Sequence, residues 1–111
     1  MDTTRQNRIA KLIQKELADI FLADGLSVYG CMITVTQTKV TPDLSLARSY
    51  LSIFNAEDNN QVISAIKKNT KDIRFRLGQK VKQQLRIIPQ LVFFVDDSLD
   101  YLENIENLLK S

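Results

Sequence analysis

Apolar residues recur every three or four positions along the first part of the chain, which is the spacing of an amphipathic helix. The apolar stripe consists of Ile9, Leu12, Ile13, Leu17, Ile20 and Phe21. Thr3 and Gln6 have the spacing of a capping box, and Gly25 suits the left-handed position that follows many helices. The pattern therefore predicts a helix that begins near Thr3 and ends within residues 23–25.

The pattern then changes to the alternation of apolar and polar residues that is typical of strands. The run CMITVTQTKV at 31–40 is rich in β-branched residues, and the run SLARSYLSIF at 45–54 alternates. One face of the second run carries Ala47, Ser49, Leu51 and Ile53. Pro42 followed by Asp43 favours a type I turn between the two runs. These features predict a half-buried antiparallel hairpin.

Helical spacing returns after the hairpin in two separate stripes. The first consists of Val62, Ile63 and Ile66, and the second of Ile73, Leu77, Val81 and Leu85. Asn55 or Asp58 is a candidate cap for the first helix, and Thr70 for the second. Because the spacing shifts between the stripes and Asn69 also favours a cap, we expect a helix break within residues 68–72.

A third strand and a last helix follow. LVFFV at 91–95 has strand character, and Asp97 or Ser98 can cap a helix that runs through Leu99, Leu102, Ile105 and Leu109. Phe93 is expected to face the helices; a register shift of one residue would place Phe94 there instead.

The order of these elements predicts the fold class. A strand, two helices and a further strand form a crossover, so the second and third strands can pair in parallel. We expect one α+β domain over residues 1–111, with the order α-β-β-α-α-β-α. Its three-stranded mixed sheet has helices packed on one face.

The charges are polarised along the chain although the net charge is only +2. Residues 67–86 contain eight of the fifteen Lys and Arg residues and one acid, Asp72, whereas the chain from Asp96 onward has a net charge of −4. On a helical projection the outer side of the second helix after the hairpin carries Lys71, Phe75, Arg76, Lys82 and Arg86, with Arg74 and Lys80 near its borders. We expect Phe75 to be an exposed aromatic residue among cations.

A basic helix with an exposed aromatic side chain is typical of nucleic-acid binding. The first helix adds a second basic row beside its apolar stripe. The candidate RNA-binding residues are Arg5, Arg8, Lys11, Lys15, Lys67, Lys71, Arg74, Arg76, Lys80, Lys82 and Arg86. Two other interpretations stay open: a charged face that is merely solvated, and a surface that binds an acidic protein or a membrane.

Little in the sequence supports catalysis. The chain has no histidine, the commonest proton-transfer group at neutral pH. Its one cysteine, Cys31, has no basic neighbour in sequence, and the adjacent acids Asp96 and Asp97 suit helix capping. Metal-ligand spacing and a glycine-rich phosphate loop are absent from the sequence. With neither a secretory signal nor a long apolar run, we expect a cytosolic protein that is not an enzyme and needs no cofactor.

Four segments carry a resemblance to a known family. They are RIAKLIQKELADIF, TVTQTKVTPDLSLARSYLSIF, DIR and LRIIPQLVFFVDDSL, and the most specific parts are DL-x-x-AR-x-Y with S-x-F after it and the RIIPQL-x-F junction. With these segments the chain resembles the ribosome-binding factor A family over nearly its whole length. The resemblance implies a type II KH-like fold and a non-enzymatic factor that binds the small (30S) ribosomal subunit and its rRNA. It further implies a role late in subunit assembly and in processing of the 5′ end of the small-subunit rRNA.

The resemblance also bears on the site and the partners. Arg8, Arg74 and Arg86 fall where the family tends to have basic residues. The family usually has an Ala-x-Gly kink between its two central helices; here the matching residues are Asn69, Thr70 and Lys71, without glycine, so a side-chain contact from Lys71 is the alternative to close backbone approach. We expect a monomer with no small-molecule substrate and no membrane partner. A general single-strand RNA-binding module and a module that binds an acidic protein stay as alternatives.

Overall fold

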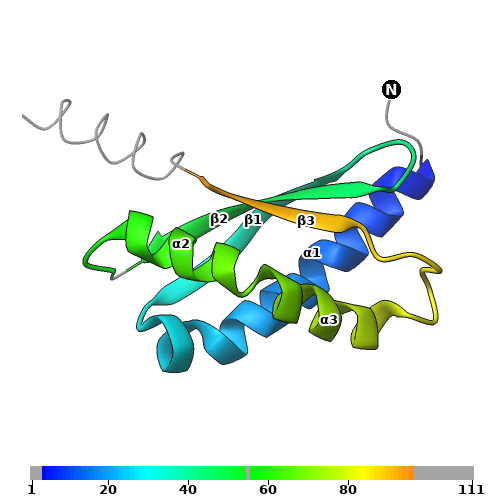
Figure 1. Ribbon diagram of the computed structural model, residues 1–111. Helices are drawn as coiled ribbons and strands as arrows, with labels where there is room; N and C mark the ends of the chain where they lie inside the picture. The colour runs from blue at the N-terminus through cyan, green and yellow to red at the C-terminus, as the bar shows by residue number, and fades with distance from the viewer. Residues whose placement is uncertain (1–3, 55, 97–111) are drawn as a thin grey trace, which may run out of the picture.

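In the described part of the chain, three helices cover one face of a three-stranded sheet, and no described helix covers the opposite face (Figure 1). The computed structural model describes residues 4–54 and 56–96. Its strands are β1 (Met32–Val40), β2 (Leu46–Phe54) and β3 (Gln90–Val95), in the order β1-β2-β3. Its helices are α1 (Thr4–Asp24), α2 (Asn59–Lys68) and α3 (Thr70–Val81). β1 pairs antiparallel with β2, and β2 pairs in parallel with β3, so the expected α+β architecture and crossover are confirmed. The expected last helix and the Thr3 and Asn55 caps lie outside the described residues.

The core lies between the sheet and the helices. α1 buries Ile9, Ile13, Leu17, Ile20 and Phe21, and α3 buries Ile73, Leu77 and Val81, all of which belong to the predicted stripes. Leu12 of the first stripe is only partly buried, and Leu85 of the second is buried beyond the end of α3. From the sheet, Leu51 and Phe93 point into this layer and are fully buried. The ring of Phe93 meets that of Phe21 edge to face, with 5.7 Å between ring centroids. Phe94 is 40% exposed on the open face, so the expected register of β3 is confirmed.

The hairpin forms as the sequence indicates, with one irregularity. The backbone N–H of Leu44 donates to Thr41 O at 2.8 Å, and the Asp43 carboxylate accepts hydrogen bonds from the Thr41 hydroxyl and from Ser45. In β1 the register with β2 shifts at Thr36, where a β-bulge leaves one residue unpaired in the ladder. The Thr36 hydroxyl donates to Tyr50 O and to the Asp96 carboxylate, which ties the end of β3 to the bulge.

α1 ends at Asp24, within the predicted residues 23–25. One π-helical turn, η1 (Gly25–Tyr29), follows it, and the left-handed residue is Gly30, with φ of 69°, rather than Gly25. Gly25 is needed for close packing, because a Cβ atom there would lie 2.7 Å from Cys31 O. The predicted left-handed conformation of Gly25 was wrong because a glycine at a helix end serves either conformation or close packing, and the sequence does not distinguish them.

The break between α2 and α3 is confirmed and falls at Asn69. Its backbone N–H donates to Ala65 O and Ile66 O, and α3 starts at the next residue. The Asn69 side chain donates to the Tyr29 hydroxyl at 3.2 Å, which fixes the break against η1. Thr70 does not cap α3, because its hydroxyl donates back to Ile66 O instead. Asp58 caps α2 by accepting the Asn60 N–H at 2.9 Å.

Candidate nucleic-acid interface

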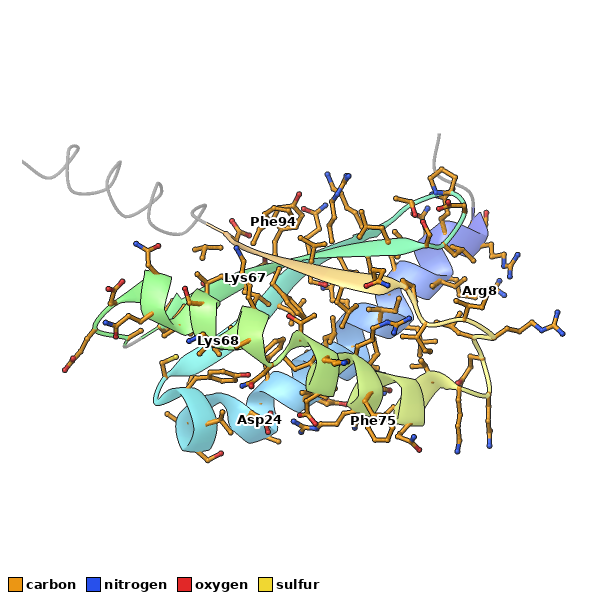
Figure 2. The ribbon with its side chains drawn as sticks, in the orientation of Figure 1. Arg8, Asp24, Lys67, Lys68, Phe75 and Phe94 are labelled. Carbon is orange, nitrogen blue, oxygen red and sulfur yellow. The ribbon has the colours of Figure 1, made fainter. Side chains whose placement is uncertain are left out.

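The outer face of α3 carries the exposed aromatic residue that the sequence predicts. α3 buries Ile73, Leu77 and Val81 against the sheet layer, so the opposite side of the helix faces outward. Phe75 is 65% exposed and points away from the sheet (Figure 2). Lys71, four residues before it, is exposed as well, and so is Lys82, which directly follows the last residue of α3. The helix and its C-cap residue thus present an aromatic ring between two cations.

Arg76 is not available as an outward phosphate contact, contrary to its projected position. Its guanidinium donates from Nη1 to Asp24 Oδ2 and from Nη2 to Asp24 Oδ1, the latter at 3.2 Å. Nη1 also lies 3.8 Å from the Asp72 carboxylate. The hydrogen bond with Asp24 raises the pKa of Arg76, because it favours the charged guanidinium. A helical projection predicts the direction of the Arg76 side chain from the helix axis. It does not predict the contact with Asp24, because Asp24 is 52 residues away in sequence.

Three more of the expected cations, Arg74, Lys80 and Lys15, are held by their own chain. Arg74 donates from Nε to Pro89 O at 3.0 Å and from Nη2 to Ile88 O at 2.6 Å, so it fixes the loop that leads into β3. The Lys80 ammonium lies 3.7 Å from the Glu16 carboxylate, and the Lys15 ammonium lies at the same distance from that acid. These side chains connect α3 to its neighbours, which lowers the number of cations free for a partner.

The remaining cations form two separate groups. We call the first the α2–α3 basic surface; its exposed members are Lys67, Lys68, Lys71, Lys82 and Arg86. Arg86 lies in the loop after α3 rather than on the helix, because α3 ends at Val81. The second group lies on α1, with Arg5, Arg8 and Lys11 exposed. Figure 2 shows Arg8 far from Lys67 and Lys68, at the other end of the molecule. Lys68 was missing from the candidate residues, although its place in the last turn of α2 next to Lys67 is visible in the sequence.

A groove runs between α3 and the loop that leads into β3. Its volume is about 390 Å³, and its lining includes Lys71, Phe75, Gly78, Lys82 and Ile88. A second hollow of about 450 Å³ lies at the start of α2, and its lining includes Glu57 and Asp58 but no cation. Phosphates are attracted to the first lining and repelled by the second. Of these two hollows, the groove on α3 is therefore the one that suits a nucleic acid.

The described residues provide little for catalysis. Cys31 is buried, and its burial raises the pKa of the thiol, which disfavours the reactive thiolate. Within residues 4–54 and 56–96, no three His, Cys, Asp or Glu side chains lie together as metal ligands would. Over the same ranges, no helix combines the length and apolar character needed to cross a membrane. What the described surface offers is charge and an aromatic ring rather than a reactive group.

Known proteins are similar to this chain in sequence and in fold. A family model described as Ribosome-binding factor A matches residues 5–109. The Ribosome-binding factor A of Cytophaga hutchinsonii is 42% identical over 110 residues, which are 98% of this chain and 83% of that protein. The crystal structure of ribosome-binding factor A from Thermus thermophilus has a TM-score of 0.68 at 19% identity, over 81% of this chain and 94% of that one. A homology model of the Thermus thermophilus factor, fitted into a cryo-EM map of a 30S complex, has a TM-score of 0.64 at 20% identity and covers 79% of this chain and 91% of that one. The chain belongs to the ribosome-binding factor A family.

Proposed function

We propose that this protein binds the small ribosomal subunit through its rRNA and assists the late maturation of that subunit, including processing of the 5′ end of the rRNA. It acts in the cytoplasm as a monomer, without a cofactor, a small-molecule substrate or a membrane partner, and it catalyses no reaction itself. Membership of the family supports this function, as does the 30S complex into which the related Thermus thermophilus factor was fitted.

The α2–α3 basic surface is the observation that carries the proposal. None of its five cations has a carboxylate within ion-pair distance among the described residues, whereas Arg76 has two and Lys80 has one. Free cations on a rigid helical surface can displace the counterions of an RNA backbone, which is the main source of affinity for nucleic acids. Arg5, Arg8 and Lys11 on α1 are proposed as a second, more distant phosphate contact. Arg74, Arg76, Lys80 and Lys15 support the surface through their own contacts instead.

Co-sedimentation with small subunits tests the proposal. The double substitution Lys71→Glu/Lys82→Glu reverses two cations that make no ion pair in the described structure, so the variant is expected to fold and to lose small-subunit binding. Lys39→Glu/Arg48→Glu is the matched control. Lys39 and Arg48 are exposed and lie opposite each other on β1 and β2. The control changes the net charge of the protein by the same amount as Lys71→Glu/Lys82→Glu. It also replaces one pair of like charges, both positive, by another, both negative.

The control variant is expected to sediment with small subunits like wild type. Equal retention of both variants with small subunits would contradict the proposal. Binding of wild type to unstructured RNA as tight as to small subunits would favour a general RNA-binding module. Partners that survive nuclease treatment in a pull-down would favour an acidic protein as the target.

A further inference from the structure

The groove beside Phe75 contains an exposed aromatic ring and an apolar side chain, neither of which is needed to bind a phosphate. A phosphate contact needs only a cation, yet the ring of Phe75 is 65% exposed in the middle of the basic row. The apolar residue Ile88 lines the groove opposite α3. An aromatic ring in a cationic groove is the combination with which proteins bind unpaired nucleotides, because the base stacks on the ring while the backbone meets the cations.

Two contacts hold the groove in shape. The side chain of Ile88 packs on Gly78, one turn after Phe75, where a Cβ atom would lie 3.4 Å from Ile88 Cγ1. A larger residue at position 78 would therefore press against Ile88. Arg74 fixes the far wall, since its guanidinium donates to the carbonyl oxygens of Ile88 and Pro89. The groove is thus preformed by contacts within the chain, and its occupant does not have to order it.

The spacing of the cations fits one nucleotide. At a rise of 1.5 Å per residue, Lys71 lies about 6 Å before Phe75 along the helix axis, and Lys82 lies about 10 Å after it. Lysine side chains extend several ångströms, so both ammonium groups can reach phosphates on either side of a base that lies on the ring. No ion pair holds either ammonium group in the described part of the chain.

We propose that this groove binds a single unpaired RNA nucleotide, with its base stacked on Phe75 and its flanking phosphates at Lys71 and Lys82. A paired base hides its faces in the helix stack, so the site selects single-stranded or extruded nucleotides. The inference rests on the proposed function and adds the class of rRNA element that this surface binds: a bulge, a loop or a single-stranded end.

The absence of tryptophan from the sequence permits a direct test. The variant Phe75→Trp places the only indole of the protein in the groove, and titration with a short unstructured oligoadenylate is expected to quench its fluorescence by stacking. Met32→Trp is the matched control: Met32 is 52% exposed, but it lies on β1 at the open face of the sheet, and its indole is expected to stay unquenched. Phe75→Leu is expected to weaken oligoadenylate binding about five- to a hundredfold, the typical effect of losing one stacked base, while Phe75→Tyr retains it.

The outcomes separate this inference from the proposed function. If Phe75→Leu binds oligoadenylate like wild type and Phe75→Trp is not quenched, the nucleotide site is excluded even where Lys71→Glu/Lys82→Glu still loses small-subunit binding. If polyglutamate quenches Phe75→Trp as strongly as RNA does, the groove recognises negative charge and not bases, which overturns the inference. If Lys71→Glu/Lys82→Glu keeps full small-subunit binding, the proposed function of this surface fails instead.

Discussion

Arg76 on α3 holds Asp24 at the end of α1 with both terminal nitrogens of its guanidinium. The Asp24 side chain is 16% exposed and that of Arg76 36%, so the pair is partly shielded from water. A shielded two-point contact of this kind stabilises more than an ordinary surface ion pair does. Arg76 therefore joins two helices and is not a free cation of the basic surface.

Reversing the charge of Arg76 is expected to destabilise the fold. Arg76→Glu places a carboxylate against Asp24 and close to Asp72, and we expect the free energy of unfolding to fall by about 1–2 kcal/mol. Urea unfolding measures this change. The charge swap Asp24→Arg/Arg76→Asp is expected to recover part of the loss. A single variant as stable as wild type would mean that the contact contributes nothing.

The register of β3 can be tested by truncation of neighbouring aromatic residues. Leu51→Ala and Phe93→Ala each empty a fully buried site and are expected to cost about 2–5 kcal/mol of unfolding free energy. Phe94→Ala loses only a half-exposed stack on Tyr50, whose ring centroid lies 5.3 Å away, and is expected to cost about 1 kcal/mol. Thermal or chemical unfolding of the variants measures these losses of unfolding free energy. A larger loss for Phe94 than for Phe93 would indicate the opposite register.

The hairpin turn is expected to weaken in acid. Hydrogen bonds from Thr41 and Ser45 lower the pKa of the Asp43 carboxyl, so the folded turn favours the ionised form. A group with a lowered pKa contributes stability above its unfolded pKa and loses it as pH falls through the folded one. We expect Asp43→Ala to melt below wild type at pH 7, and the gap to close below about pH 4. A gap that is constant from pH 7 to pH 3 would exclude a role for ionisation.

The sequence predicts what depends on neighbours along the chain. Helical and alternating periods indicate which residues are buried, and they place Leu51 and Phe93 correctly. The cap-forming residue Asn69 marks the helix break, because backbone hydrogen bonding there involves only residues within a few positions. The order of elements then limits the topology to a crossover, which the sheet confirms.

What the sequence does not predict depends on contacts between distant segments. At the β-bulge, the Thr36 hydroxyl donates a hydrogen bond to the carboxylate of Asp96, which is sixty residues further along the chain. Gly25 packs against the Cys31 carbonyl oxygen, and the left-handed residue is Gly30, at the end of η1. For the same reason a projection of α3 overestimated the free cations, since the partners of Arg74, Arg76 and Lys80 lie in other elements. The predicted exposure of Phe75 is confirmed, and the predicted number of cations without an intramolecular partner was too large. RNA binding by these residues stays a prediction.

The salt dependence of small-subunit binding tests the central claim most directly. If the α2–α3 basic surface contacts four or five rRNA phosphates, a plot of log affinity against log salt concentration for wild type should have a slope of about −3 to −4. Removal of two contacts in Lys71→Glu/Lys82→Glu should make the slope shallower by about 1.5, while Lys39→Glu/Arg48→Glu keeps the wild-type slope. Equal affinities and parallel slopes for all three proteins would contradict the claim that this surface binds rRNA.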